Sequence, residues 1–378
     1  SEKLQAARER ENELSGQAVD LMVMKEWNGP RRPWHVLARG QFDQPTDPVT
    51  PGVPAAILPF DESLPRNRLG FAQWLTDRKH PLTSRVAVNR FWQLLFNRGL
   101  VPTPEDFGTQ GRPPSHPELL DWLAVDFMEN GWDVKALCRR LVLSTAYRQS
   151  SIPSSPAARE RDPDNILLAR GPRVRLSGEA LRDMALAVSG LLVPKLGGPS
   201  VFPYQPAGLW EESGTQHTYH QGKGADLYRR SLYSFWRRTL PPPTLTVFDA
   251  PTREFCKVRR ERTNTPLQAL VLMNDPQFIE AARVLSENLI RQYPTDDTAR
   301  IRDAFRLLTS TTPDAKQLAA LTAYLAKERP LVTAAESKTL LANNGDHVAD
   351  PTLDPLEVTA TTRMIRLLLG FQETAMKP

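Results

Sequence analysis

The sequence contains only two cysteines, Cys138 and Cys256, among its 378 residues. Two thiols cannot supply a four-cysteine zinc site or a disulfide framework, although they could form one bridge. No Cys-x-x-Cys-His motif occurs, so the chain cannot attach c-type haem covalently. We therefore expect no cofactor in the chain itself.

Long apolar runs are also missing. A membrane-spanning helix needs about 18 consecutive apolar residues. Even the segment 185–194 is shorter, and Ser189 and Gly190 interrupt it. The chain starts at Ser1 and continues into a charged run over 2–13, with neither an initiator methionine nor an apolar signal segment. We expect the natural polypeptide to start upstream.

Proline is abundant, with 34 residues, which is about 9 % of the chain against a typical share of about 5 %. This content is unfavourable for long uninterrupted helices. The chain is 40 % apolar and 8 % aromatic, which is enough to form a core, and its length suggests about two domains. These values exclude wholesale disorder and predict a globular protein.

We predict a mainly α-helical fold, a multi-helix bundle-like domain with long proline-rich loops and a minor short-strand element. Its parts are residues 1–65, 66–160 and 161–378. The first part combines a charged helix over 2–13 with a proline-rich connector, in which 34–37 forms a short edge strand because prolines flank it. The second part contains four short amphipathic helices joined by brief turns, as in helical bundles.

Helix ends in the second part carry recognisable signals, namely capping residues, proline near the start and glycine after the end. We expect helices over 69–78, from Pro81, from Pro117 to Gly131 and from Asp133, with Gly99 as the C-terminal cap of the second.

The third part repeats one device four times, a capping residue followed by proline at the first helical position, where the missing amide proton has no helical partner. The four pairs start at Thr265, Asp275, Thr312 and Asp354. Segment 197–224 has no periodicity and is long for a structureless loop. Segment 228–238 is ambiguous and favours a short strand. Further helices are predicted from Ser177, over 299–308 and over 333–341.

Positive charge is concentrated in one stretch. The chain has a net charge of +5, whereas residues 223–262 contain ten lysines or arginines and four acids. Such a stretch can bind a polyanion, for example a sulfated or carboxylated glycan, an acidic protein face or nucleic acid. The alternative is internal pairing of these arginines with acids of other helices, since they alternate with aromatics at a half-buried surface.

Two long segments carry a family resemblance. They are NRLGFAQWLTDRKHPLTSRVAVNRFWQLLFNRGLVPTPEDFGTQGRPPSHPELLDWLA, from Asn67, and FDAPTREFCKVRRERTNTPLQALVLMNDP, from Phe248. Both resemble the planctomycete-specific domain family PSD-one, a domain of unknown function, and the likeness extends from Arg66 to the C-terminus. The resemblance implies export, and many members carry a planctomycete-type cytochrome c segment and a second domain of unknown function upstream. The chain would then be the C-terminal part of a larger extracytoplasmic polypeptide with haem c in an upstream domain.

The candidate ligand-binding residues lie in and beside the basic stretch. Arginine can bind a carboxylate or sulfate through two parallel hydrogen bonds, and side-chain amides can add more. An aromatic ring such as that of Trp210 could stack on a sugar. The set comprises Trp210, Arg229, Arg230, Arg237, Arg259, Arg260, Arg262, Asn264 and Gln268.

Three residues are candidates for catalysis. Glu211 and Glu212 could do acid and base work on a polysaccharide if a cleft separates two carboxylates. Cys256 lies among arginines that favour its thiolate, which could act as a nucleophile or a soft metal ligand. No histidine close in sequence could serve as its base.

Two further groups each have a functional and a structural interpretation. His217 and His220 could bind a metal if the backbone turns between them, or they could lie on an exposed loop. The motif residues Asn89, Arg90, Trp92, Asp106, Phe107 and His116 could form a polar pocket, or a buried network that holds helix ends.

We therefore predict an extracytoplasmic accessory or binding module of a larger cytochrome c-associated protein, which recognises an anionic polysaccharide or a partner protein. One alternative is a polysaccharide-acting enzyme with its carboxylates near the loop 197–224. Another is nucleic-acid binding through the basic stretch, which the implied export disfavours.

Overall fold

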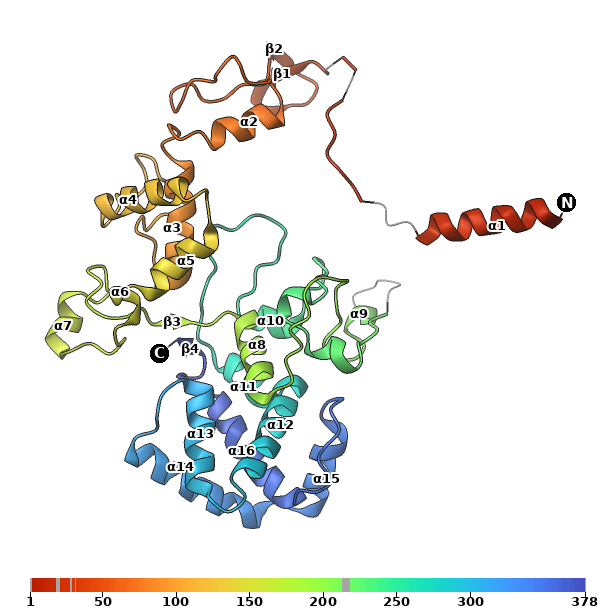
Figure 1. Cartoon of the computed structure of the whole chain (residues 1–378), viewed down its shortest axis with the longest axis vertical. Coiled ribbons are helices and arrows are strands. Elements are labelled where there is room, and N and C mark those ends of the chain that lie inside the picture. The colour runs from red at the N-terminus through yellow and green to blue at the C-terminus, as the bar shows by residue number, and fades with distance from the viewer. Residues whose placement is uncertain (1, 18–20, 28, 31, 213–217, 378) are drawn as a thin grey trace. The chain divides into compact units, whose positions relative to one another are not determined.

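The computed structural model describes residues 2–17, 21–27, 29–30, 32–212 and 218–377. The chain divides into two compact units, unit 1 (residues 1–84) and unit 2 (residues 85–378). Over the described ranges, helices dominate the regular structure and strands form only two two-stranded sheets, which confirms the predicted fold class (Figure 1). None of the described helices is both long enough and apolar enough to cross a membrane.

Unit 1 combines two helices with a hairpin. Helix α1 spans Glu2–Gln17, and helix α2 spans Arg68–Leu75. Strand β1 (Trp34–Leu37) pairs antiparallel with β2 (Pro45–Val49) and places Trp34 opposite Val49, with the 3-10 turn η1 (Ala38–Gly40) between them. The strand predicted over 34–37 is confirmed, and its partner β2 itself contains two prolines, as expected for a strand at a sheet edge.

In unit 2, one apolar core lies among α3 (Thr83–Phe96), α4 (Pro117–Glu129) and α5 (Val134–Leu143). The rings of Trp92 and Phe96 stack there with centroids 4.0 Å apart. The four helices predicted for this part of the sequence are present as α2 to α5. The short helices α6 (Thr145–Arg148) and α7 (Pro156–Arg161) follow.

Asn89 holds the end of α3 to the chain that follows it. Its fully buried amide donates to the carbonyl oxygen of Val101 at 3.1 Å and accepts from the Val101 amide at 2.9 Å. The network interpretation of this motif is therefore confirmed for Asn89. The predicted cap at Gly99 is wrong, because Asn97 takes the left-handed conformation after the helix, with φ +70°. Gly99 instead lets Asn89 approach, since a Cβ there would lie 2.7 Å from its Nδ2 atom.

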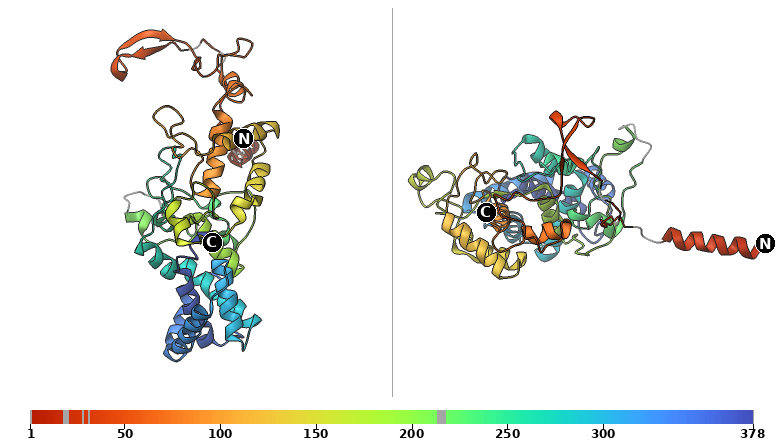
Figure 2. Two further views of the ribbon diagram at one scale, coloured as in Figure 1. Left: turned by 90° about the vertical axis from the view of Figure 1, so that its left-hand side faces the viewer. Right: turned by 90° about the horizontal axis from the view of Figure 1, so that it is seen from above.

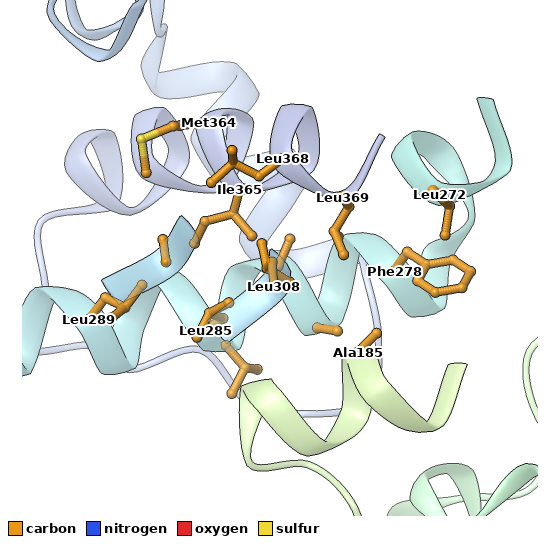
Figure 3. Packing of buried hydrophobic residues seen from close by; sticks show 14 of the residues in the cluster. Ala185, Leu272, Phe278, Leu285, Leu289, Leu308, Met364, Ile365, Leu368 and Leu369 are labelled. Atoms are coloured by element: carbon orange, nitrogen blue, oxygen red, sulfur yellow. The ribbon is translucent and has the colours of Figure 1, made fainter. Parts of the chain in front are cut away.

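A second and larger core of unit 2 surrounds α12 (Pro276–Gln292). This helix packs against α8 (Gly178–Ser189), α11 (Pro266–Asn274), α13 (Asp297–Thr309) and α16 (Pro355–Leu369). The cyan-to-blue helices lie side by side in both directions of view (Figures 1 and 2). Side chains of α8, α11, α12, α13 and α16 converge between them, as the labelled residues of Figure 3 illustrate.

The remaining elements of unit 2 are short or peripheral. They are β3 (Val174–Arg175) paired with β4 (Met376–Lys377), α9 (Leu209–Glu212), α10 (Pro243–Val247), α14 (Ala315–Glu328), the 3-10 turn η4 (Arg329–Leu331) and α15 (Ala334–Asn343).

Three of the four predicted proline starts are confirmed. Thr265, Asp275 and Asp354 cap α11, α12 and α16 with their side chains, and proline follows each of them. The fourth start, at Thr312, is wrong by two residues. Helix α14 is capped by Asp314, whose carboxylate accepts from the Gln317 amide while the Gln317 side chain accepts from the Asp314 amide. This reciprocal capping box outweighs a proline start.

The strand predicted over 228–238 is wrong. The segment starts at the last residue of the 3-10 turn η2 (Gly224–Tyr228) and contains the 3-10 turn η3 (Ser231–Tyr233), with isolated bridges beside them. The buried guanidinium of Arg182 explains this outcome, because it donates to the carbonyl oxygens of Leu227 at 2.7 Å and Arg229 at 2.8 Å. A β-ladder would need those acceptors.

Two carboxylates, the partly buried Glu357 and the buried Glu280, fix the C-terminal helices. Glu357 of α16 accepts hydrogen bonds from Arg300 of α13 and from Arg329 of η4. Glu280 of α12 accepts at one oxygen from the Tyr228 hydroxyl and the His347 amide, both at 2.8 Å. The segment beside Glu280 includes Gly345, with φ +98°, where a Cβ would lie 2.0 Å from the carboxylate.

Candidate anion-binding site

A hollow of about 350 Å³ opens in unit 2 beside the end of α3. We call it the basic hollow, and it is lined by residues 96–98, 163–165 and 170–173. Asn97 and Asn165 on its wall both have positive φ, at +70° and +52°. Left-handed residues other than glycine are uncommon and concentrate at turns and functional sites.

The wall formed by residues 162–173 is built by local hydrogen bonds. The buried carboxylate of Asp162 accepts from the amides of Ile166 and Leu167, both at 2.8 Å. The Asn165 side chain donates to the carbonyl oxygen of Arg170 at 2.8 Å. The Gly171 amide donates to Ser150 at 2.8 Å, where the chains pass too close for a side chain. The wall is therefore fixed before any ligand binds.

The lining of the basic hollow carries a surplus of positive charge. Arg98 pairs with Asp164 at 2.9 Å, so these two charges compensate each other. Arg170 donates only to backbone carbonyl oxygens, those of Asp162 at 2.8 Å and Pro163 at 2.6 Å. Arg173 is exposed and pairs with no acid in the described part of the chain. Two guanidinium charges thus remain without a carboxylate.

A second element reaches this hollow, the exposed basic loop formed by residues 250–262. It is the teal connection between α10 and α11 (Figure 1). At its base, the Asp249 carboxylate accepts from the Thr263 amide at 2.7 Å and from the Thr263 hydroxyl. The buried Gln268 side chain donates to Thr263 at 3.1 Å and accepts from Arg175 at 2.7 Å. These hydrogen bonds hold the two ends of the basic loop together.

Arg262 connects the basic loop to the basic hollow. Its guanidinium donates to the side-chain oxygen of Asn97, a lining residue. Burial, and then the neighbouring charge of Arg260, lower the pKa of Arg262. Arg260 itself is paired with Glu179 at 2.8 Å, whereas Arg259 and Asn264 are exposed. The structure therefore brings Arg262 of the predicted set to the rim of the hollow.

The other predicted arginines have structural partners. Arg229 is buried, donates to the carbonyl oxygens of residues 195, 197 and 199, and lies 3.8 Å from the Tyr233 ring centroid. Arg230 contacts Asp183 at 3.3 Å. Arg237 lies over the Trp210 ring at 4.7 Å. Pairing with an acid of another helix, as the internal-pairing alternative has it, is thus seen for Arg230, whereas Arg229 and Arg237 are held by carbonyl oxygens and by aromatic rings.

Trp210 lies in an aromatic cluster with Phe202, Tyr219 and Phe235. It is 8 % exposed, and its ring centroid is 5.2 Å from that of Tyr219 and 5.9 Å from that of Phe235. With Arg237 over its face, this ring is occupied by the protein itself. Stacking of a sugar on Trp210 would require the cluster to open.

None of the three candidate catalytic residues lines the basic hollow. Glu211 and Glu212 are consecutive and exposed on the four-residue helix α9, so they do not face each other across a cleft. Cys256 is a free, exposed thiol on the basic loop, and Cys138 is also free.

His217 lies outside the described residues, and His220 is exposed on the loop that follows them. Within the ranges that the structure describes, no group of three or more histidine, cysteine or acidic side chains is placed to hold a metal ion.

The arginines that line the hollow are not among the residues predicted from sequence. Arg98 follows the end of α3 as a single basic residue with nothing to distinguish it. Arg170 and Arg173 lie in the segment ARGPRVR, whose three arginines within six residues form a small basic cluster that could have been noticed.

Comparisons with known proteins identify a family. The model of the family described as PSD1, protein of unknown function (DUF1553), matches residues 67–325. No curated protein and no solved structure matches the chain. The match includes the basic loop and every residue that lines the basic hollow.

Proposed function

The chain belongs to the PSD1 family of proteins of unknown function, and from this premise we propose that it is a binding module that recognises anionic groups of a polysaccharide. Its family resemblance implies export and an upstream cytochrome c segment. The module would then act outside the cytoplasm as an accessory part of a larger polypeptide and hold that polypeptide at an acidic polymer.

One observation carries the proposal, the surplus of guanidinium charge around the basic hollow. Arg170, Arg173 and Arg262 approach one hollow without a carboxylate partner among the described residues. Placing like charges together is unfavourable unless an anion compensates them. Guanidinium groups bind sulfate and carboxylate with two parallel hydrogen bonds, so a sulfated or carboxylated sugar would supply that compensation.

The form of the hollow also fits a group on a polymer. Its wall over 162–173 is braced by its own hydrogen bonds, which reduces the entropy lost on binding. The basic loop beside it adds exposed cations along a longer surface, which suits a chain that continues beyond the hollow. No reactive group is needed for this role.

Binding of a heparin octasaccharide to the full chain, measured by isothermal titration calorimetry, tests the proposal. We expect the double variant Arg173→Ala/Arg262→Ala, which removes two of the uncompensated guanidinium groups, to bind at least tenfold more weakly than the wild type. Each ionic contact with the octasaccharide releases about one counterion when it forms. The slope of log affinity against log salt should therefore become shallower by about one for each contact that is removed.

The matched control is Arg302→Ala/Arg306→Ala, which removes two exposed arginines from one face of α13. We expect this variant to keep the affinity of the wild type, and a neutral octasaccharide to bind to none of the proteins. Equal losses in the two double variants would show that net charge alone attracts the octasaccharide, and would refute a site at the basic hollow.

A further inference from the structure

Unit 1 contains a groove that the proposed function does not use. Its volume is about 1140 Å³, and it lies between residues 25–27, 30 and 32–34, the end of β2 with residues 50–53, and residues 60–71. We call it the unit 1 groove. It shares no residue with the basic hollow, so an inference from it stands apart from the proposed function.

Large aromatic rings line the unit 1 groove and remain open to solvent. Trp27 is 79 % exposed, Trp34 is 64 % exposed and Phe71 is 46 % exposed. Gly29 packs against the indole of Trp27, where a Cβ would lie only 2.4 Å from the ring nitrogen. Exposed rings gathered in one groove mark a binding surface. Unlike Trp210, these tryptophans are exposed rather than buried.

The charged side chains of the unit 1 groove are mostly basic, with four cations and one carboxylate in its lining. The carboxylate, Glu26, pairs with Arg68 of α2 at 3.2 Å and so holds residues 25–27 to the helix. Lys25 and Arg32 each lie two residues before one of the two tryptophans, and neither forms an ion pair with any described residue. The groove therefore combines ring faces with uncompensated positive charge.

These features distinguish between two anionic ligands that the groove could bind, a peptide and a polysaccharide. A peptide added as a strand is held by main-chain hydrogen bonds, but three prolines of the lining have no amide proton to donate. A pyranose ring needs no such donor. It presents a face of C–H groups that packs on tryptophan, and a uronic acid adds a carboxylate for arginine and lysine.

We propose that the unit 1 groove binds an acidic polysaccharide of uronic acid units, whose rings stack on Trp27 and Trp34 and whose carboxylates meet Lys25 and Arg32.

The test uses the full chain and a hexamer of galacturonic acid, with binding followed by calorimetry and by tryptophan fluorescence. We expect Trp27→Ala/Trp34→Ala to bind the hexamer at least tenfold more weakly than the wild type. Arg32→Ala weakens binding severalfold, and more so at low salt. Maltohexaose, a neutral hexamer, binds at least tenfold more weakly than the acidic one. Because these side chains are exposed, the substitutions leave the folding of unit 1 intact.

Trp122→Ala is the matched control, since Trp122 is 55 % exposed on α4 in unit 2. It keeps wild-type affinity for the hexamer. Arg173→Ala/Arg262→Ala also keeps the tryptophan-dependent binding, so failure at the basic hollow is distinguishable from failure here. Hexamer affinity unchanged in Trp27→Ala/Trp34→Ala overturns the proposal. The proposal is also overturned if the wild type binds an alternating Leu-Glu peptide through its tryptophans but does not bind the hexamer. That result would make the groove a protein-docking surface.

Discussion

Removing the charge of Glu357 is expected to destabilise unit 2 more than removing a comparable surface charge. The Glu357 carboxylate accepts from Arg300, which is 1 % exposed, and from two nitrogens of Arg329 at 2.8 and 2.7 Å. Arg329 also pairs with Asp297 at 2.6 Å. The variant Glu357→Gln would leave Arg300 as a buried cation whose nearest acid is Asp297 at 3.4 Å.

The magnitude follows from burial. Breaking a fully buried ion pair by removing one partner costs about 3–5 kcal/mol. The Glu357 side chain is 22 % exposed, and Arg300 keeps the carbonyl oxygens of Tyr293 at 2.9 Å and Pro294 at 3.1 Å. Both features reduce the loss, so we expect the free energy of unfolding to fall by about 2–3 kcal/mol.

Urea unfolding monitored by circular dichroism measures this change. At an m value of about 3 kcal/mol/M, the midpoint falls by about 0.7–1 M. The control is Asp121→Asn, which removes a carboxylate paired with Arg85 at 2.6 Å at the surface. That pair contributes about 1 kcal/mol or less. A Glu357→Gln protein that loses no more stability than Asp121→Asn would refute the argument from burial.

Three further predictions concern stability. The pKa of Glu357 is lowered, chiefly by hydrogen bonds from Arg329, so its stabilisation is present above its usual pKa of 4.5 and is lost as pH falls below it. Urea midpoints of the wild type and Glu357→Gln should therefore converge as the pH falls below 4.5, and a constant difference would contradict this. Asn89→Ala leaves the buried amide and carbonyl of Val101 without partners and lowers the free energy of unfolding by about 2–3 kcal/mol in urea. Gly345→Ala brings a Cβ against the Glu280 carboxylate in a left-handed conformation, so the melting temperature should fall, and an unchanged value would show that the segment moves aside.

Local signals predicted much of the fold. Asp133, Ser177, Asp275 and Asp354 cap helices where the sequence indicated, because a capping side chain bonds the amides of the next turn and needs no distant partner. Segment 228–238 could not be assigned in this way. Its conformation depends on Arg182, which lies about 45 residues earlier and takes its carbonyl oxygens.

The candidate site was harder to predict from the sequence, because it also depends on contacts between residues that are far apart in the chain. A run of arginines predicts positive charge, but burial decides which of them face solvent. The guanidinium group of Arg229 donates to carbonyl oxygens, and that of Arg237 lies over an aromatic ring. Arg262, in contrast, donates to Asn97, which is 165 positions away in the sequence. The basic hollow itself joins segments around residues 97 and 165, which only the folded chain brings together. The family match concerns the same residues but adds no chemistry to them.

Within unit 2, limited trypsin digestion should cut in the loop between α10 and α11, where Arg253, Lys257 and Arg259 are exposed. The flanking helices remain bound to the core around α12, and the bonds of Asp249 to Thr263 cross the cut from one fragment to the other. A nicked molecule would thus migrate as a single particle under native conditions and separate into two peptides only in denaturant.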